Sequence, residues 1–373
     1  MKYHSQLKWC LLLLLLLGGA VFFRYFTDDP LTAAKTQLSA KGYKVKAIHY
    51  SNPIDDSLGK LKKILNRESL RVTCIEWYTP RESLEIKEEL DRLAPYIETL
   101  QCGLTKVSDQ DALILGKMHQ LKNLQVYGPD LSARGVSQLS QLKHLTWLEL
   151  YAPQATDESL RWLEENDQLS WLYLSDSQAG TATMQRIAHH REMVRLDLQG
   201  TRIESSDLQY LTGFPRLHML ELNRTFIDDR AAAYLGQMQS LGTLYLSETE
   251  VGDEVCRSLA ELPELTSLKL DDTLVTDQGV QALLEGRAPL KDLSLRRCEV
   301  TAKAFMEARS WPAQLETLSV RGTAINGKEI LAIIESHPSL IIVGYNQRDT
   351  DSEIIEQIDA MLEKRRVHNQ NRR

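Results

Sequence analysis

The stretch "LTWLELYAPQATDESLRWLEENDQLSWLYL", residues 145–174, contains one six-residue phrase twice, as LTWLEL at 145 and as LSWLYL at 169. The phrase recurs at 193, 217, 241, 265, 290 and 315, in steps of 24 or 25 residues. Weaker copies stand at 45, 72, 97, 121 and 340. A fixed period of this length is typical of stacked repeats, in which each unit buries its apolar face against the next. The 373-residue chain is therefore predicted to contain about 13 coils of one stack.

Each copy of the phrase predicts a short strand. Its fourth and sixth residues are apolar, and the third, fifth and seventh are mostly polar or aromatic, which is the period of a strand with one buried face. The roughly 18 residues between phrases are enough for the chain to cross back, so neighbouring phrases are expected to pair in parallel.

The segment between two phrases has its own pattern. A threonine follows most strands (Thr201, Thr225, Thr249, Thr273 and Thr323), whereas Pro153, Ser177 and Cys298 occupy this place in other repeats. Four residues later an aspartate is expected to cap a short helix, at Asp157, Asp229, Asp253 and Asp277. Apolar residues then follow at helical spacing, as at Leu160 with Leu163 and at Val280 with Leu283 and Leu284.

This pattern resembles the leucine-rich repeat family over residues 45 to about 346. The resemblance implies an α/β solenoid in the form of a horseshoe or arc, with a parallel β-sheet on the concave face and short helices on the convex face. Threonine replaces the asparagine of the best-known members, as in many bacterial relatives, and its hydroxyl is expected to bond the turn backbone. The resemblance says little about function, because such solenoids carry unrelated functions on their variable surface positions.

The N-terminal residues 1–26 are predicted to be a signal anchor or a signal peptide. Lys2 and Lys8 precede an apolar run over residues 9–23, which Arg24 ends. As a helix this run spans about 22 Å, short of a bilayer core of about 30 Å, while Gly18 and Ala20 would suit cleavage. Both alternatives stay open. The lysines predict that the rest of the chain lies outside the cytoplasm, in a periplasm or on a cell surface.

The ends of the stack need caps, because they would otherwise expose core. Residues 27–44 are assigned to an N-terminal cap with a helix ending near Gly42, and residues 347–373 to a C-terminal cap helix and a basic tail. The final KRRVHNQNRR is expected to be disordered. It is interpreted as a solvated tail or, alternatively, as a segment attracted to anionic lipid or polymer.

The third, fifth and seventh positions of the strands are expected to line the concave face. Aromatic residues gather there in one zone, and Trp147 and Trp171 should be neighbours about 4.8 Å apart. Rigid aromatics rimmed by charge are typical of protein interaction sites and of sugar-binding sites, although such rings can also stabilise the sheet as a ladder without any ligand. The predicted partner-binding residues are Trp147, Glu149, Tyr151, Trp171, Tyr173, Tyr127, Asp197 and Glu221. A protein partner is preferred, and an envelope or cell-wall glycan is the alternative.

Other classes of function find little support. The net charge of −7 with no basic groove argues against nucleic acid. Five scattered cysteines suggest neither a disulfide framework nor a metal site, and Cys102 and Cys256 are expected in the core.

We find no catalytic motif, and Glu149 and Glu221 would lie about 14 Å apart by strand spacing. No enzyme activity, catalytic residue, metal or cofactor is therefore predicted. A cytoplasmic adaptor is disfavoured, since about twenty residues between anchor and first coil cannot hold an F-box.

Overall fold

The computed structural model describes the strands at 12–13, 22–23, 44–50 and 70–76, residue 94, and residues 97–347 and 350–370. The chain forms two compact units, residues 1–178 (unit 1) and residues 179–373 (unit 2). The helix predicted near Gly42 in the N-terminal cap lies outside the described residues. The described elements of each unit are given in turn.

Unit 1 contains strands and short helical segments. Its strands are β1 (Leu12–Leu13), β2 (Phe22–Phe23), β3 (Lys44–Tyr50), β4 (Leu70–Glu76), β5 (Thr99–Lys106), β6 (Asn123–Tyr127), β7 (Trp147–Tyr151) and β8 (Trp171–Tyr173). Its helical segments are α4 (Asp109–Leu115), α5 (Ala133–Ser137), η3 (Gln138–Gln141) and η4 (Arg161–Glu165), the last two being 3₁₀ turns. The strands pair in chain order from β3 to β8.

The predicted parallel register is confirmed in unit 1 from β4 onward. The fourth residues of consecutive phrases face each other, Leu124 opposite Leu148 and Leu148 opposite Leu172. All three leucines are buried. The expectation that the copy at 45 begins this parallel series is wrong, because β3 pairs with β4 in the antiparallel direction. That phrase, VKAIHY, has no leucine and carries lysine and histidine between its apolar residues, so its repeat signal is weak.

Unit 2 repeats the same plan. Its strands are β9 (Arg195–Asp197), β10 (Met219–Glu221), β11 (Thr243–Tyr245), β12 (Ser267–Lys269), β13 (Asp292–Ser294), β14 (Thr317–Ser319) and β15 (Ile342–Gly344). Its helical segments are α6 (Thr181–Ile187), η5 (Ser205–Tyr210), η6 (Asp229–Ala231), α7 (Ala232–Leu235), α8 (Asp253–Leu259), α9 (Asp277–Glu285), α10 (Lys303–Met306), α11 (Gly327–Ser336) and α12 (Ser352–Gln370). Parallel pairs join the strands in chain order from β9 to β15.

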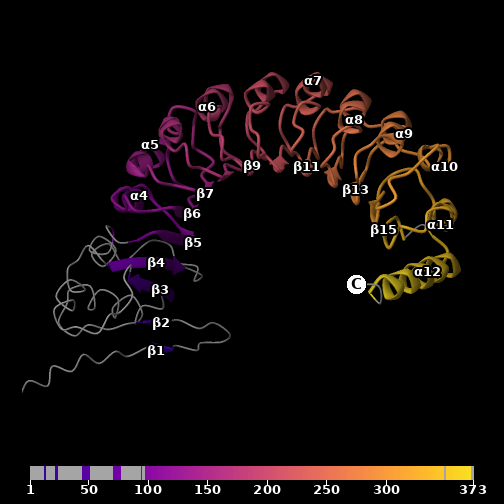
Figure 1. Ribbon diagram of the computed structural model, residues 1–373, viewed down its shortest axis with the longest axis horizontal. Coiled ribbons are helices and arrows are strands. Elements are labelled where there is room, and N and C mark those ends of the chain that lie inside the picture. The colour runs from indigo at the N-terminus through magenta and orange to yellow at the C-terminus, as the bar shows by residue number, and fades with distance from the viewer. Residues whose placement is uncertain are drawn as a thin grey trace, which may run out of the picture. The chain divides into compact units, whose positions relative to one another are not determined.

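The core of each unit lies between a layer of strands and a layer of helices. In unit 2 the strands line one side of the coils and the helical segments line the other, as Figure 1 shows. The α9 residues Val280, Leu283 and Leu284 are buried, as the helical spacing predicts. Cys256 of α8 is fully buried, which confirms its expected core position. The side chain of Cys102 lies outside the described residues.

The threonine column stabilises the turns that follow five strands of unit 2. The hydroxyls of Thr201 and Thr225 donate to the carbonyl oxygens of Leu198 and Leu222, both at 2.5 Å, and the three other threonines do the same three residues back. The predicted bond to the turn backbone is thus confirmed, and it is made within the threonine's own coil. Cys298 replaces threonine in one coil, and its Sγ lies 2.9 Å from the Leu270 carbonyl of the preceding coil.

The aspartate column does not cap its own helices, contrary to the sequence prediction. The cap of α9 is Thr276, whose hydroxyl accepts from the backbone N–H of Gln278. Asp277 instead accepts from the N–H and the hydroxyl of Thr301 in the next coil, at 2.7 and 2.6 Å. The preceding residue supplies the side-chain cap in η6, through Asp228, and in α9, through Thr276, so there the carboxylate of the column remains available to the neighbouring coil.

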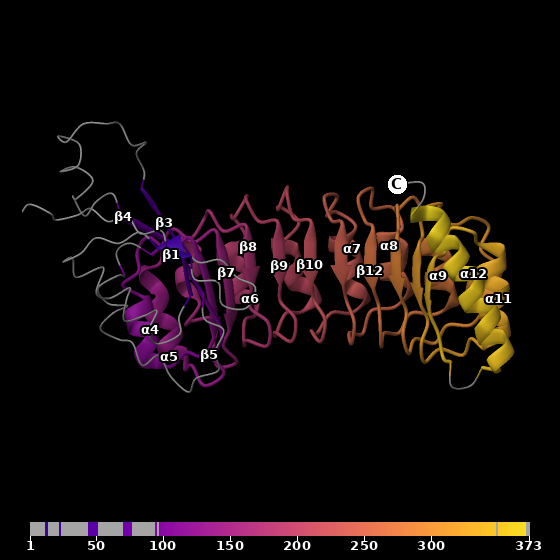
Figure 2. The ribbon, with the colours of Figure 1, turned by 90° about the horizontal axis from the view of Figure 1, so that it is seen from below.

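The helix α12 occupies most of the segment assigned to the C-terminal cap. The helix α12 lies against α11 (Figure 2) and buries Ile358 and Leu362. The prediction of a disordered KRRVHNQNRR tail is wrong for residues 364–370, which are helical, and residues 371–373 lie outside the described part. Arg365 explains the extension, because its guanidinium donates to the carbonyl oxygens of Ile334, His337 and Leu340 at 2.7 to 3.0 Å.

The predicted N-terminal anchor lies largely outside the described residues. At Leu12–Leu13 and Phe22–Phe23 the structure has two short antiparallel strands, where a helix was expected. No helix in the described ranges is long and apolar enough to cross a membrane.

Candidate partner-binding surfaces

Five aromatic residues that were predicted to contact a partner lie on the strands β6, β7 and β8 of unit 1. We call Tyr127, Trp147, Tyr151, Trp171 and Tyr173 the aromatic patch. Each is partly exposed and alternates with buried leucine or valine along its strand. Because side chains of a strand point alternately to its two faces, the apolar residues hold the strands on the core while the rings point away from it.

The rings of the patch are held in defined geometries. Trp147 and Trp171 are register partners on β7 and β8, as predicted. Trp147 also meets the ring of Tyr173, with the centroids 6.3 Å apart and the planes at 60°. Tyr127 and Tyr151 stack, with centroids 5.2 Å apart and planes at 18°. Edge and offset stacked arrangements are the favourable ones for aromatic pairs, so the rings are preorganised.

A carboxylate lies among these rings. Glu149 is partly exposed in the middle of β7, and its register partners are Gln125 on β6 and Tyr173 on β8. The Gln125 side-chain amide donates to Glu149 Oε1 at 2.9 Å. Since an amide is neutral, this bond orients the carboxylate and keeps its negative charge on the surface.

The two remaining predicted residues, Asp197 and Glu221, belong to unit 2. They are register partners on β9 and β10, and both are partly exposed. Burial and, after it, the Asp197 charge raise the pKa of Glu221, against the opposing influence of Lys269 and Arg195. Lys269 Nζ lies 3.8 Å from the ring centroid of Tyr245. The structure therefore places Asp197 and Glu221 in a charged cluster of unit 2, and the other six predicted residues in unit 1.

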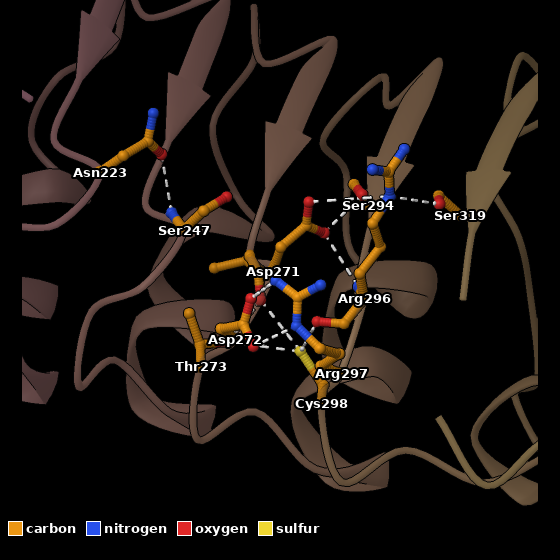
Figure 3. Close-up of polar contacts among 11 residues, drawn as sticks. Asn223, Ser247, Asp271, Asp272, Thr273, Ser294, Arg296, Arg297, Cys298 and Ser319 are labelled. Atoms are coloured by element: carbon orange, nitrogen blue, oxygen red, sulfur yellow. Dashed lines mark hydrogen bonds and ion pairs between the residues drawn. The ribbon is translucent and has the colours of Figure 1, made fainter. Parts of the chain in front are cut away.

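Polar residues just after the strands β10 and β12 of unit 2 link their coils to the next coil (Figure 3). Asn223 Oδ1 accepts from the Ser247 N–H at 2.8 Å. Asp271 Oδ1 accepts from the Arg296 N–H at 2.9 Å and from the Ser294 hydroxyl at 2.5 Å. The sequence pattern placed these residues on the open face, yet their side chains satisfy neighbouring backbone groups. They are structural links between coils.

One backbone feature was not predicted from the sequence. It is a row of residues in the left-handed backbone conformation, which we call the left-handed row. The eighth residue of each repeat has a positive φ in the coils of unit 2 that follow β9 to β14, at Gly200, Arg224, Glu248, Asp272, Arg297 and Gly322. Asp176 of unit 1 has the same backbone, with φ of 59°. Glycine at two of these places is the one signal in the sequence that could have found the row, because glycine tolerates this region best.

The structure also shows where possible metal ligands and reactive side chains lie. Within the described ranges no group of three or more His, Cys, Asp or Glu side chains is placed to hold a metal ion. His189 is exposed and His190 is buried, just after α6, with their rings 4.7 Å apart. Burial raises the pKa of the Cys256 thiol well above its usual value, which disfavours the reactive thiolate.

Comparison with solved structures shows what this arrangement of coils is similar to. An internalin, InlF, from Listeria monocytogenes aligns over 74% of this chain and 80% of its own, at 18% identity and a TM-score of 0.53. The chain has the leucine-rich repeat fold. At this identity the likeness concerns the fold alone.

Two plant leucine-rich repeat receptors are also similar to the chain at lower scores. The ectodomain of the receptor kinase GASSHO1/SCHENGEN3 from Arabidopsis thaliana, in complex with CASPARIAN STRIP INTEGRITY FACTOR 2, aligns over 74% of this chain and 32% of its own, at 15% identity and a TM-score of 0.47. The peptide hormone receptor RGFR1, in complex with RGF2, aligns over 75% and 51%, at 13% identity and a TM-score of 0.43. No protein family profile matches the chain, and no curated protein is significantly similar to it.

Proposed function

We propose that this leucine-rich repeat protein is not an enzyme and that it binds a protein partner through the aromatic patch. The observation that carries the proposal is the set of five partly exposed rings on three adjacent strands. Tyrosine and tryptophan dominate the binding energy of protein interfaces, because they offer a large contact area together with a polar group. Rings that are already fixed by their neighbours lose little further freedom on binding.

A purely structural ladder is the competing explanation. Cross-strand pairs such as Tyr127 with Tyr151 each contribute about 0.2 to 1 kcal/mol to a sheet. A ladder has no need of Glu149, a carboxylate that lies between Trp147 and Tyr151 along β7 and opposite Tyr173 of β8. A carboxylate beside these rings suits a partner that supplies a hydrogen-bond donor or a positive charge, and this favours recognition over stability.

The location of the repeats is part of the proposal. The N-terminal residues 1–26 serve as a membrane anchor or as an export signal, on the evidence of Lys2, Lys8, the apolar run and Arg24. The repeats then lie in a periplasm or on a cell surface, and the partner is an envelope or extracellular protein. An envelope glycan, which would stack on the same rings, is distinguished in the experiment below.

The test uses the full-length chain, purified in detergent and immobilised. Wild type is compared with the double variant Trp147→Ala, Trp171→Ala and with the control double variant Tyr210→Ala, Tyr234→Ala. The control removes two partly exposed aromatic residues from the helix side of unit 2. Each protein is incubated separately with solubilised envelope proteins and with insoluble cell-wall polysaccharide, after circular dichroism has shown that all three are folded.

We expect a protein that is retained by wild type and by the control and is lost from the tryptophan variant. Retention of polysaccharide with the same dependence would instead identify the patch as a glycan site. If all three proteins retain the same material, the aromatic patch is not the binding site. A folded tryptophan variant that only unfolds at a lower temperature would identify the rings as a ladder.

A further inference from the structure

A second surface in unit 2 differs from the strand face in position and in chemistry. A groove of about 760 Å³ lies along the turns that follow β9, β10, β11, β12 and β13. We call it the turn groove. Its lining includes Glu204, Phe226, Arg230, Glu248, Glu250 and Arg297. It contains none of the predicted partner-binding residues.

One aromatic ring is held out to solvent in this groove. Phe226 is 66% exposed, unlike the buried Phe305 of the core. Its backbone is fixed, because the Phe226 N–H donates to the Ile203 carbonyl of the preceding coil at 3.0 Å. Phe226 and Glu204 also form a parallel bridge. An exposed apolar ring on a rigid edge, beside a hollow, is a suitable anchor for a partner side chain.

The charge of the groove is negative. Its lining holds five carboxylates and two guanidinium groups, which leaves a net charge of −3. Both guanidinium groups already have partners in the lining. Arg230 Nη2 lies 2.7 Å from Asp228 Oδ2, and Arg297 pairs with Asp272 of the preceding coil, as Figure 3 shows.

The carboxylates outside these two pairs are Glu204, Glu248 and Glu250, and all three are exposed. Glu248 and Glu250 flank the buried Thr249 on the turn after β11, one coil away from Phe226. Such a surface repels phosphate groups and attracts cations, so it disfavours nucleic acid and anionic lipid as partners.

The backbone of the groove is shaped by the left-handed row. Glu248, Asp272 and Arg297 have φ of 57°, 53° and 57°, where glycine is found in the coils at Gly200 and Gly322. A side chain in this conformation is retained at a steric cost. These residues therefore bring charge to the edge of the coils at positions where glycine would be easier to accommodate.

We propose that the turn groove binds an extended, positively charged segment of a partner protein. An apolar side chain of the segment packs on Phe226, and lysine or arginine side chains pair with Glu248 and Glu250. This proposal does not rest on the aromatic patch, which lies in unit 1 and involves other residues.

The experiment selects random heptapeptides displayed on phage against the immobilised full-length chain in detergent. The most enriched peptide is synthesised with a fluorescein label, and its Kd is measured by fluorescence anisotropy. The variants are Phe226→Ala and the double variant Glu248→Gln, Glu250→Gln, all at exposed positions. Leu274→Ala is the control for Phe226, because Leu274 is 65% exposed at the same place in its coil and does not line the groove. Glu264→Gln is the control for charge at another exposed site.

We expect enriched peptides with a net positive charge and an apolar residue. Their Kd should rise about tenfold or more in both groove variants, stay unchanged in both controls and increase with salt. The proposal is overturned if no peptide is enriched, if the enriched peptides are neutral or acidic, or if the groove variants bind as wild type does. A peptide lost from the Trp147→Ala, Trp171→Ala variant but retained by Phe226→Ala reports on the aromatic patch instead, which keeps the two proposals distinguishable.

Discussion

The carboxylate of Asp253 reaches from its own coil to Thr276 of the next coil and accepts two hydrogen bonds there. One comes from the Thr276 N–H at 2.9 Å and the other from the Thr276 hydroxyl at 2.7 Å. The Asp229 carboxylate accepts from the Gly252 N–H at 2.8 Å in the same manner. The aspartate column therefore joins successive coils on the side where the helices begin.

Removing such a link should loosen two coils at once. We expect Asp253→Ala to lower the free energy of unfolding by about 1 to 3 kcal/mol, because the Thr276 N–H loses its acceptor in a partly buried place. Hydrogen exchange of the Thr276 amide should become faster. Glu254→Ala is the control, since Glu254 is exposed and pairs with the exposed Arg257, so its removal should leave the free energy of unfolding nearly unchanged. Unchanged exchange at Thr276 would contradict the link.

The left-handed row predicts an unequal response to alanine at two glycines. Gly200 has φ of 66°, and Gly200→Ala should destabilise the fold by about 1 to 2 kcal/mol because a Cβ clashes in this region. Gly213 is exposed, and an added Cβ there would approach only the flexible end of Arg191. Gly213→Ala should therefore be neutral within about 0.5 kcal/mol. Urea denaturation measures both, and equal effects would refute the argument.

The raised pKa of Glu221 predicts a specific dependence on pH. Burial and the nearby Asp197 make the folded protein hold the Glu221 proton more tightly than the unfolded chain does. The corresponding stability is present at low pH and is lost as the pH rises above the ordinary value of 4.5. Glu221→Gln should therefore raise the melting temperature at pH 7 and have little effect at pH 4. Glu264→Gln should change neither, and a Glu221 pKa at or below 4.5 by NMR would contradict the prediction.

Arg365 links the C-terminal helix α12 to the end of α11. Arg365 donates to three carbonyl oxygens at and after the end of α11, so Arg365→Ala leaves these acceptors without their charged donor. We expect a loss of roughly 1.5 to 3 kcal/mol and faster hydrogen exchange throughout α12. Lys364→Ala on the exposed side of the same helix is the control. Equal exchange in the two variants would show that apolar packing alone holds the cap.

Much of the fold could be predicted because its signals are local and periodic. A leucine such as Leu148 faces the core wherever the period-two pattern holds, and the 24-residue step brings it opposite Leu172. The members of the aromatic patch follow from the same alternation, so the exposure of Trp147 and Trp171 was predictable from their place in the phrase.

The contacts between side chains could not be predicted in this way. Trp147 meets the ring of Tyr173 on the diagonal, although its register partner is Trp171. Which neighbour a ring meets depends on side-chain rotamers and on the twist of the strands, and neither follows from spacing. For the same reason the pattern suggested that Asp277 caps its own helix, while the carboxylate bonds Thr301 one coil away.

The sequence alone determined the repeat length, the strand register and the outward positions, because each of these depends on the identity of residues at fixed intervals. Folding in three dimensions decided the antiparallel β3, the links from aspartate to the next coil, the left-handed row and the turn groove around Phe226. The aspartate links and the turn groove arise from residues of neighbouring coils, such as Asp253 with Thr276 and Glu204 with Phe226, which meet only when the coils stack. The sequence of a single repeat does not specify which residues of the neighbouring repeat lie opposite its own.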